Sequence, residues 1–259
     1  MRQDKKSKTM DRKERFIRYQ KKWNEENVEA DRFHWQTSNR IIVEKEERLL
    51  GAIGHCKGKN VLEVGCGEGA NIYNLKTSGK RFTGIDFSNS RIRFAKKNVK
   101  NANSVFMFGD GTDIKFKDGS FDVVFCRDVI HHVWEHEKLM KEMYRVCKSG
   151  GSVILVESNA WNPVNFMFSL IFKKESGMRK IHPRYIRKLF SRLDVNKNIT
   201  IGYSEGYNLD RLIFHYRMGF PKLSKYASIQ SLNHAVNRIF EFITPRIFWA
   251  YMIVECKKR

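Results

Sequence analysis

The sequence is short of acidic residues, of proline and of long apolar segments. It has 28 Asp and Glu against 49 Lys and Arg, a formal net charge of +21, and four prolines among 259 residues. Its five cysteines form no Cys-x-x-Cys pair, which argues against the common zinc and redox motifs and predicts reduced thiols in a cytoplasmic protein. The apolar runs at 166–172 and 247–254 are too short to span a bilayer.

The positive charge is concentrated in two segments. Residues 1–22 contain ten basic and three acidic residues, and residues 173–197 contain nine and two, so each segment carries +7. Residues 61–157 carry only +3. A solvated basic surface and a surface that binds an anionic partner are equally compatible with this pattern.

Short apolar runs alternate with helix-like segments through the middle of the chain. The runs cover 61–64, 82–85, 105–108, 121–126 and 153–157, and the helical patterns between them cover 70–76, 90–100 and 135–147. This alternation predicts an α/β fold, a Rossmann-like doubly wound sheet that is mainly parallel. We expect a C-terminal antiparallel strand at 248–256 and helical additions at the N-terminus and after the fifth strand.

Three glycines lie between the first predicted strand and the first predicted helix. Residues 65–70, Gly-Cys-Gly-Glu-Gly-Ala, satisfy the pattern G-x-G-x-x-G/A, and Asp86 follows about 20 residues later, at the end of the next strand. A carboxylate there accepts hydrogen bonds from ribose hydroxyls, and both NAD and S-adenosylmethionine carry a ribose. The loop and Asp86 therefore predict a nucleoside site without naming the nucleoside.

Three further features favour S-adenosylmethionine over NAD. Glu63 lies two residues before the first glycine, and a carboxylate there suits a zwitterionic amino acid and would repel a pyrophosphate. Asp110 follows the third strand, where it can accept from an adenine amino group while Gly111 and Thr112 offer backbone N–H groups to the ring. The strand at 121–126 opens into polar residues at its carboxyl end, where open α/β sheets bind their ligands.

Residues 61–157 resemble class I S-adenosylmethionine-dependent methyltransferases, of the broad group that includes ubiquinone and menaquinone biosynthesis methyltransferases. Four stretches in the family's order carry the resemblance: "VLEVGCGEG", "GIDFS", "FGDGTDIKFKDGSFDVVFCRDVIHHV" and "MKEMYRVCKSGGSVILVE". It implies that Phe87 lies against the adenine and that Arg127 offers backbone near the methionine end. The cofactor-binding residues that we expect are Glu63, Gly65, Cys66, Gly67, Gly69, Asp86, Phe87, Asp110, Gly111, Thr112 and Arg127.

The resemblance also divides the chain into parts. We expect residues 1–54 to form a basic arm and helix that cover the site, and residues 55–160 to form the S-adenosylmethionine-binding core. Residues 161–259 would hold substrate-side insertions and the last strands of the same sheet. Both +7 segments are then expected to border the mouth of the substrate site.

Methyl transfer needs positioning first and a base where the acceptor carries a proton. The candidate bases are His131 and His132 at the mouth of the fourth strand, with His182 in the basic segment, although an imidazole that only shapes the pocket is the commoner case. No metal ion is expected.

The acceptor is predicted to be a small or lipid-like, anionic or membrane-associated molecule that is methylated on oxygen or carbon. Residues 161–174, apolar and then basic, suit a lid, a membrane interface or an ordinary buried helix, which leaves open a peripheral contact with the anionic inner face of the membrane. RNA methylation is the alternative function, because the charge suits phosphate. The remaining alternative functions are a cofactor-binding subunit without activity and an NAD oxidoreductase.

Overall fold

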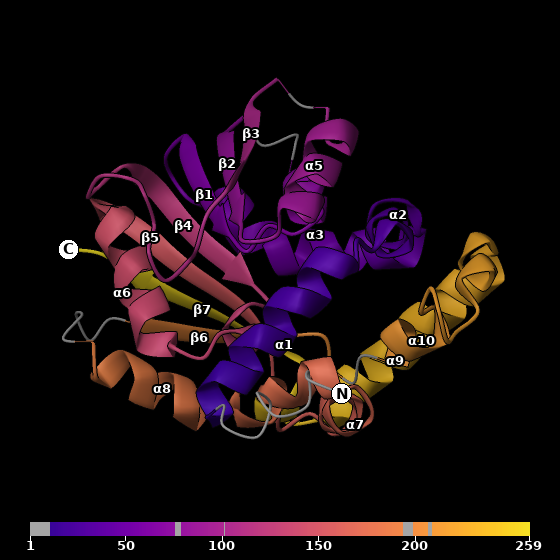
Figure 1. The fold of residues 1–259 in the computed structure, drawn as a ribbon. Coiled ribbons are helices and arrows are strands. Elements are labelled where there is room, and N and C mark those ends of the chain that lie inside the picture. The colour runs from indigo at the N-terminus through magenta and orange to yellow at the C-terminus, as the bar shows by residue number, and fades with distance from the viewer. Residues whose placement is uncertain (1–10, 76–78, 101, 194–198, 207–208) are drawn as a thin grey trace, which may run out of the picture.

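A single seven-stranded sheet organises the protein. The computed structural model describes residues 11–75, 79–100, 102–193, 199–206 and 209–259. The strand order is β3-β2-β1-β4-β5-β7-β6 (Figure 1). The strands are β1 Asn60–Val64, β2 Arg81–Asp86, β3 Ser104–Phe108, β4 Phe121–Arg127, β5 Cys147–Ser158, β6 Ile199–Ser204 and β7 Tyr251–Lys257.

The first five strands pair in parallel, and the last two are antiparallel. β1 lies between β2 and β4, with Val61 opposite Phe82 and Val123, and β7 runs antiparallel to both β5 and β6. The chain reverses its direction of growth at β1, and the crevice at that point is where such sheets hold their ligands. The predicted Rossmann-like fold with a C-terminal antiparallel strand is confirmed.

Helices cover both faces of the sheet because successive side chains of a buried strand point to opposite sides. Val61 packs with α3 (Arg40–His55) and α5 (Asn89–Asn98), whereas Leu62 packs with α6 (His136–Val146) and α8 (Pro183–Ser191). The result is two hydrophobic cores, one on each face. The middle of the sheet is therefore apolar on both faces, and the polar residues of the strands lie toward the strand ends.

The remaining elements gather at the carboxyl ends of the strands and beyond. They are α1 Arg12–Glu26, α2 Ala30–Ser38, α4 Ala70–Asn74, η2 Ile130–His132, α7 Pro163–Ile171, η3 Lys173–Lys180, α9 Leu209–Ile213, η4 Pro221–Lys225, α10 Ala227–Ile243 and η5 Arg246–Phe248. Helix α1 lies across the front of the sheet, and α10 projects from the rest of the molecule (Figure 1). In the part of the chain that the structure describes, no helix combines the length and apolar character needed to cross a bilayer.

Candidate cofactor and acceptor site

The glycine loop connects β1 to α4 in a backbone conformation that residues with a Cβ atom rarely adopt. Gly65, Gly67 and Gly69 have φ angles of +75°, +51° and +84°, all in the left-handed region. A Cβ on Gly69 would come within 2.9 Å of Val99, so this glycine permits close packing on α5. A Cβ on Gly67 would meet no heavy atom nearer than 3.9 Å, so at Gly67 the bare backbone borders open space.

That space is a cavity of about 480 Å³ at the carboxyl end of the sheet. Nine of the predicted cofactor residues line it: Gly65, Cys66, Gly67, Asp86, Phe87, Asp110, Gly111, Thr112 and Arg127. Both candidate bases in η2, His131 and His132, line it as well. Residues predicted from separate motifs are therefore brought to one cavity, whereas Glu63 and Gly69 lie behind its wall.

Asp86 holds the loop in place and still faces the cavity. Its Oδ2 accepts from the Gly67 amide at 2.9 Å and its Oδ1 accepts from the Ser88 amide at 2.9 Å. Burial raises the pKa of this carboxyl, while Arg91 and the two amides oppose that rise. A carboxylate has about four acceptor positions, so two remain for further donors.

Glu63 lies behind the cavity wall and not in its lining. Its side chain is fully buried, does not line the cavity, and accepts from Asn71 Nδ2 at 2.6 Å. Burial raises its pKa to about 8, so the group is mostly protonated at neutral pH. A protonated Glu63 carries no charge that would repel a pyrophosphate, and in the structure Glu63 orients Asn71, which does line the cavity; its part in binding the cofactor stays a prediction.

The turn after β3 differs in one respect from the prediction. Asp110 is exposed, and its Oδ1 accepts from both the backbone N and the Oγ1 of Thr112, each at 2.8 Å. The Thr112 amide is thus committed to Asp110 and is not offered to the cavity. Asp110 and Gly111 keep their places in the lining.

Arg127 lies at the end of β4 with its side chain tied away from solvent. The guanidinium pairs with Glu46 and donates through Nη1 to Asn71 Oδ1 at 3.0 Å. Arg127 and Asn71 therefore link β4 and α4 at the place where the loop meets the cavity. The sequence indicated the position of Arg127 but not these partners.

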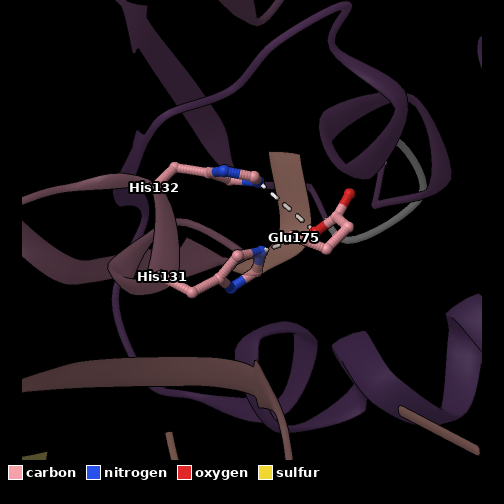
Figure 2. Close-up of side chains that lie close together, drawn as sticks. All are labelled: His131, His132 and Glu175. Atoms are coloured by element: carbon pink, nitrogen blue, oxygen red, sulfur yellow. Dashed lines mark hydrogen bonds and ion pairs between the residues drawn. The ribbon is translucent and has the colours of Figure 1, made fainter. Parts of the chain in front are cut away.

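His131, His132 and Glu175 lie close together (Figure 2), and all three line the cavity. His131 Nδ1 lies 3.0 Å from Glu157 Oε2 and its Nε2 lies 3.1 Å from Glu175 Oε2. His132 Nε2 is 3.8 Å from the same Glu175 oxygen. Glu175 comes from η3, so His131 fastens the segment after α7 to the end of the sheet.

The two histidines differ in protonation. Burial would lower the pKa of His131, but the hydrogen bonds to Glu157 and Glu175 outweigh it and raise the pKa to about 10. Burial and then the charge on His131 lower the pKa of His132 to about 3. At neutral pH His131 is therefore a cation and His132 is neutral. Among the described residues the buried His132 Nδ1 has no hydrogen-bond partner, so it can accept one.

Two other expectations concern nearby groups. His182 does not line the cavity: its Nδ1 accepts from Tyr185 N at 3.2 Å at the start of α8, and its ring stacks on Trp161.

In the described residues, donor atoms of His131, His132 and Glu175 lie within 4.8 Å of one another, as do those of Asp128, His131 and Glu157. Both groups depend on His131, whose nitrogens each hold a carboxylate, and the expectation of no metal stays a prediction.

Three cationic side chains that line the cavity, Arg32, Lys174 and Arg217, form a cluster that we call the cationic corner. Arg32, Lys174 and Arg217 surround the buried Glu29 at 3.5, 3.6 and 3.4 Å. Although burial acts to raise the pKa of Glu29, Arg32, Lys174 and a hydrogen bond from Tyr216 lower it to about 2. Three cations share this carboxylate, and Lys174 also lies 3.7 Å from Glu175 Oε1, so positive charge exceeds negative charge beside the cavity.

Sequence reasoning missed most of this corner. Arg32, Lys174 and Arg217 come from α2, η3 and the segment after α9, and all three line the cavity. Of these, Lys174 alone lies in a segment whose charge we had assigned to the mouth of the site. Lys21 of α1 lines the cavity too, while residues 1–10 and 194–197 of the two basic segments lie outside the described residues.

Residues 62–155 match the family model described as a methyltransferase domain. Norajmaline N-methyltransferase of Rauvolfia serpentina is 32% identical over 105 residues, 39% of this chain and 36% of that protein. Demethylmenaquinone methyltransferase of Lactococcus lactis is 30% identical over 132 residues, 47% of this chain and 52% of that protein. The chain thus spans from about a third to a half of the length of these curated relatives. Residues 62–155 are a class I S-adenosylmethionine-dependent methyltransferase domain.

Solved structures show that the fold extends beyond this methyltransferase domain. Phosphoethanolamine N-methyltransferase 2 of Haemonchus contortus, in complex with S-adenosyl-L-methionine, matches with a TM-score of 0.67 and 19% identity over 92% of this chain and 60% of that one. A possible histamine N-methyltransferase of Thermotoga maritima matches with a TM-score of 0.65 and 16% identity over 93% of this chain and all of that one. At these identities the likeness establishes the fold alone.

The methyltransferase domain fits S-adenosylmethionine, the cofactor of its class. The open backbone at Gly67 provides a cradle that a side chain would fill, and Asp86 keeps acceptor positions for hydroxyl groups. Phe87, Asp110 and Gly111 border the same cavity, just after the ends of β2 and β3. These residues are the ones that we propose hold the cofactor.

Proposed function

We propose that this chain transfers the methyl group of S-adenosylmethionine to a small anionic molecule held between the glycine loop and the cationic corner. The observation that carries the proposal is the surplus of positive charge where Arg32, Lys174 and Arg217 share Glu29 beside the cavity. An anion placed there would complete the pairing of cations that are partly removed from water. A volume of about 480 Å³ is also in the range of small-molecule sites.

The residues around the cavity have distinct tasks in this proposal. S-adenosylmethionine, when bound, supplies an electrophilic methyl group. Asp86 and the glycine loop fix the nucleoside, and the cationic corner fixes the acceptor, because orientation alone can contribute effective molarities of ~10⁵ M or more. His132 is neutral and lines the cavity, so it is the candidate base for an acceptor that carries a proton, and its pKa of about 3 makes it a weak base.

The charged His131 has a positioning task. It cannot act as a base at neutral pH, because its two nitrogens are held by Glu157 and Glu175 and its pKa is raised to about 10. It keeps η3 against the sheet and, with η3, holds Lys174 at the acceptor end. Its charge also helps to keep His132 unprotonated.

The names of relatives support a small acceptor but not one acceptor atom. They include a norajmaline N-methyltransferase, demethylmenaquinone methyltransferases and a phosphoethanolamine N-methyltransferase. We therefore widen the predicted oxygen or carbon acceptor to include nitrogen. Lipid-like anionic acceptors drawn from a membrane belong to the same proposal.

Turnover with a panel of acceptors tests the proposal. The purified chain is incubated with S-adenosylmethionine and phosphorylated amines, acidic phenols, quinone precursors, anionic lipids or RNA, and S-adenosylhomocysteine is measured. We expect turnover with a small anion, and Arg217→Gln should raise its KM about tenfold or more while cofactor affinity is unchanged. Arg40→Gln, which removes an exposed pairing with Glu44 outside the cavity, is the matched control.

Three outcomes would contradict the proposal. Methylation of RNA without methylation of any small anion would favour the alternative function. Binding of S-adenosylhomocysteine without turnover of any acceptor would indicate a cofactor-binding subunit. Binding of NAD without S-adenosylhomocysteine would indicate an oxidoreductase.

A further inference from the structure

The helix α10 exposes an apolar face that the methyltransferase domain does not use. Leu232, Ile239, Phe242 and Ile243 are exposed on it, Phe242 to 91%. These positions recur at intervals of seven, three and one residues, which places them on one side of a helix. The opposite side, around Asn233, is turned toward the protein. Exposed apolar side chains gathered in this way on a soluble protein mark an interaction surface.

The apolar face continues at both ends of α10. At its start, η4 and the residues before it expose Met218, Phe220, Leu223 and Tyr226. At its end, η5 exposes Ile247 and Phe248, and α7 exposes Phe166, Met167, Leu170 and Ile171. Asn162, at the start of α7, donates to Phe248 O at 3.0 Å, and Asn159 donates to Ile247 O at 2.8 Å, so α7 and η5 are adjacent. We call the exposed apolar side chains of η4, α10, η5 and α7 the α10 surface.

Within the segment that carries α10 the exposed charge has one sign, and Glu44 of α3, which reaches α10 from outside this segment, pairs with His234 at 3.0 Å. Between Leu209 and Ala250, where the structure describes every residue, the charged side chains that are exposed are Arg217, Lys222, Lys225, Arg238 and Arg246. The two acidic residues of that stretch are withdrawn from the surface: Asp210 is buried beside Lys45 and Glu241 is half-buried. Apolar side chains bordered by lysine and arginine are the pattern of helices that lie in the interface of an anionic bilayer.

We propose that the α10 surface seats this chain on an anionic lipid bilayer. A second copy of the chain is a poorer occupant, because a symmetric pairing would bring Arg238 and Arg246 close to basic residues of its partner. Anionic headgroups neutralise the same residues while the acyl region takes up Phe242 and its neighbours.

The surface adjoins the cavity. Phe168 and Phe172 line the cavity, whereas Phe166 and Leu170 of the same α7 segment are exposed on the outside. Met218 is half-exposed and also lines the cavity. The inference extends the proposed function by naming where a lipid-like acceptor would enter, but its test needs no methyl transfer.

Vesicle sedimentation of the full chain tests directly whether the α10 surface binds an anionic bilayer. We expect the wild type to bind vesicles of phosphatidylcholine with about 30% phosphatidylglycerol at least tenfold more tightly than vesicles of phosphatidylcholine alone. Ile239→Glu with Phe242→Glu should lose about tenfold or more of the binding to the anionic vesicles. Val105→Glu, at an exposed apolar position on the opposite edge strand β3, is the matched control and should bind as the wild type does.

Two measurements keep the result interpretable. The affinity for S-adenosylhomocysteine should be equal in all three proteins, which shows that the α10 variant is folded. Sedimentation velocity without lipid should show equal masses. Equal vesicle binding by the wild type and the α10 variant, or no binding by the wild type, would overturn the proposal. The proposal would also be overturned if the wild type formed a dimer and the α10 variant did not, because the α10 surface would then bind a second copy of the chain.

Discussion

At the scale of single residues, Asp86 joins the shape of the glycine loop to the chemistry of the nucleoside. It accepts from the Gly67 and Ser88 amides and keeps acceptor positions toward the cavity. We predict that Asp86→Ala weakens S-adenosylhomocysteine binding by about 1.5–3 kcal/mol, the scale for hydrogen bonds to charged groups. Calorimetry measures the change, with Asp113→Ala, an exposed residue outside the cavity, as control. Unchanged affinity would mean that the ribose lies elsewhere.

His132 is the residue whose protonation state matters to transfer. Because burial and the charge on His131 lower its pKa to about 3, it stays neutral from pH 5 to pH 8 and cannot itself produce an acid limb near pH 6.5. If it is the base, His132→Gln lowers kcat by about 10²–10⁴-fold and leaves cofactor affinity unchanged. Stopped-assay kinetics over that pH range measure both effects. An unchanged kcat would give His132 the structural role of shaping the pocket.

Motif residues of the candidate site could be predicted, but its acceptor side could not. Gly67 and Asp86 belong to a local strand–turn–helix pattern, so their proximity follows from neighbouring segments of the chain. Arg32, Lys174 and Arg217 meet at Glu29 from places up to 188 residues apart, and no local pattern marks them. The full burial of Glu63 and the rise in pKa that it causes are likewise not visible in the sequence.

At the scale of elements, η3 depends on a charge pair with the sheet. His131 of η2 holds Glu175 of η3 while it is protonated, and its pKa in the folded chain is about 10 against an ordinary value of 6.5. A raised folded pKa gives stability that is complete below about pH 6.5 and is lost as the pH rises toward 10.

The variant His131→Gln tests that dependence. We predict that the wild type exceeds the variant in unfolding free energy below pH 6.5, by about 1–3 kcal/mol, and that the difference shrinks steadily toward pH 10. Urea unfolding at several pH values measures it. His182→Gln, a histidine outside the cavity, serves as control. A difference that does not change with pH would show that His131 contributes by packing alone.

The strands were predictable as elements because each is a short buried run between turn residues. The described part of the chain confirms the parallel core and the antiparallel last strand, which begins at Tyr251 where the pattern indicated 248. The segment after β5 resisted prediction, because α7 is buried on one side and exposed on the other. The composition of this segment was equally compatible with a lid, a membrane interface and a buried helix. In the structure, hydrogen bonds from the Asn162 and Asn165 side chains to distant backbone carbonyls fix the position of α7.

At the scale of the whole molecule, the net charge of +21 is separated from the cofactor end of the cavity. Residues 61–157, which supply the proposed nucleoside site, carry only +3, whereas the acceptor end is bordered by the cationic corner and by Lys21. Attraction between partly exposed charges is screened beyond ~8 Å at physiological salt. Salt should therefore act unequally on the two ligands.

We predict that raising the salt concentration weakens acceptor use more than cofactor affinity. Alanine in place of Lys173, Lys174, Arg179 and Lys180 should mimic high salt, raising the KM for the acceptor while the Kd for S-adenosylhomocysteine holds. Alanine in place of the four exposed basic residues of α5 and its end, Arg93, Lys96, Lys97 and Lys100, removes the same charge outside the cavity and should change neither. Equal effects of the two quadruple variants would mean that net charge acts through the long-range field of the molecule. An effect of the first variant alone would place the attraction at the mouth of the acceptor site.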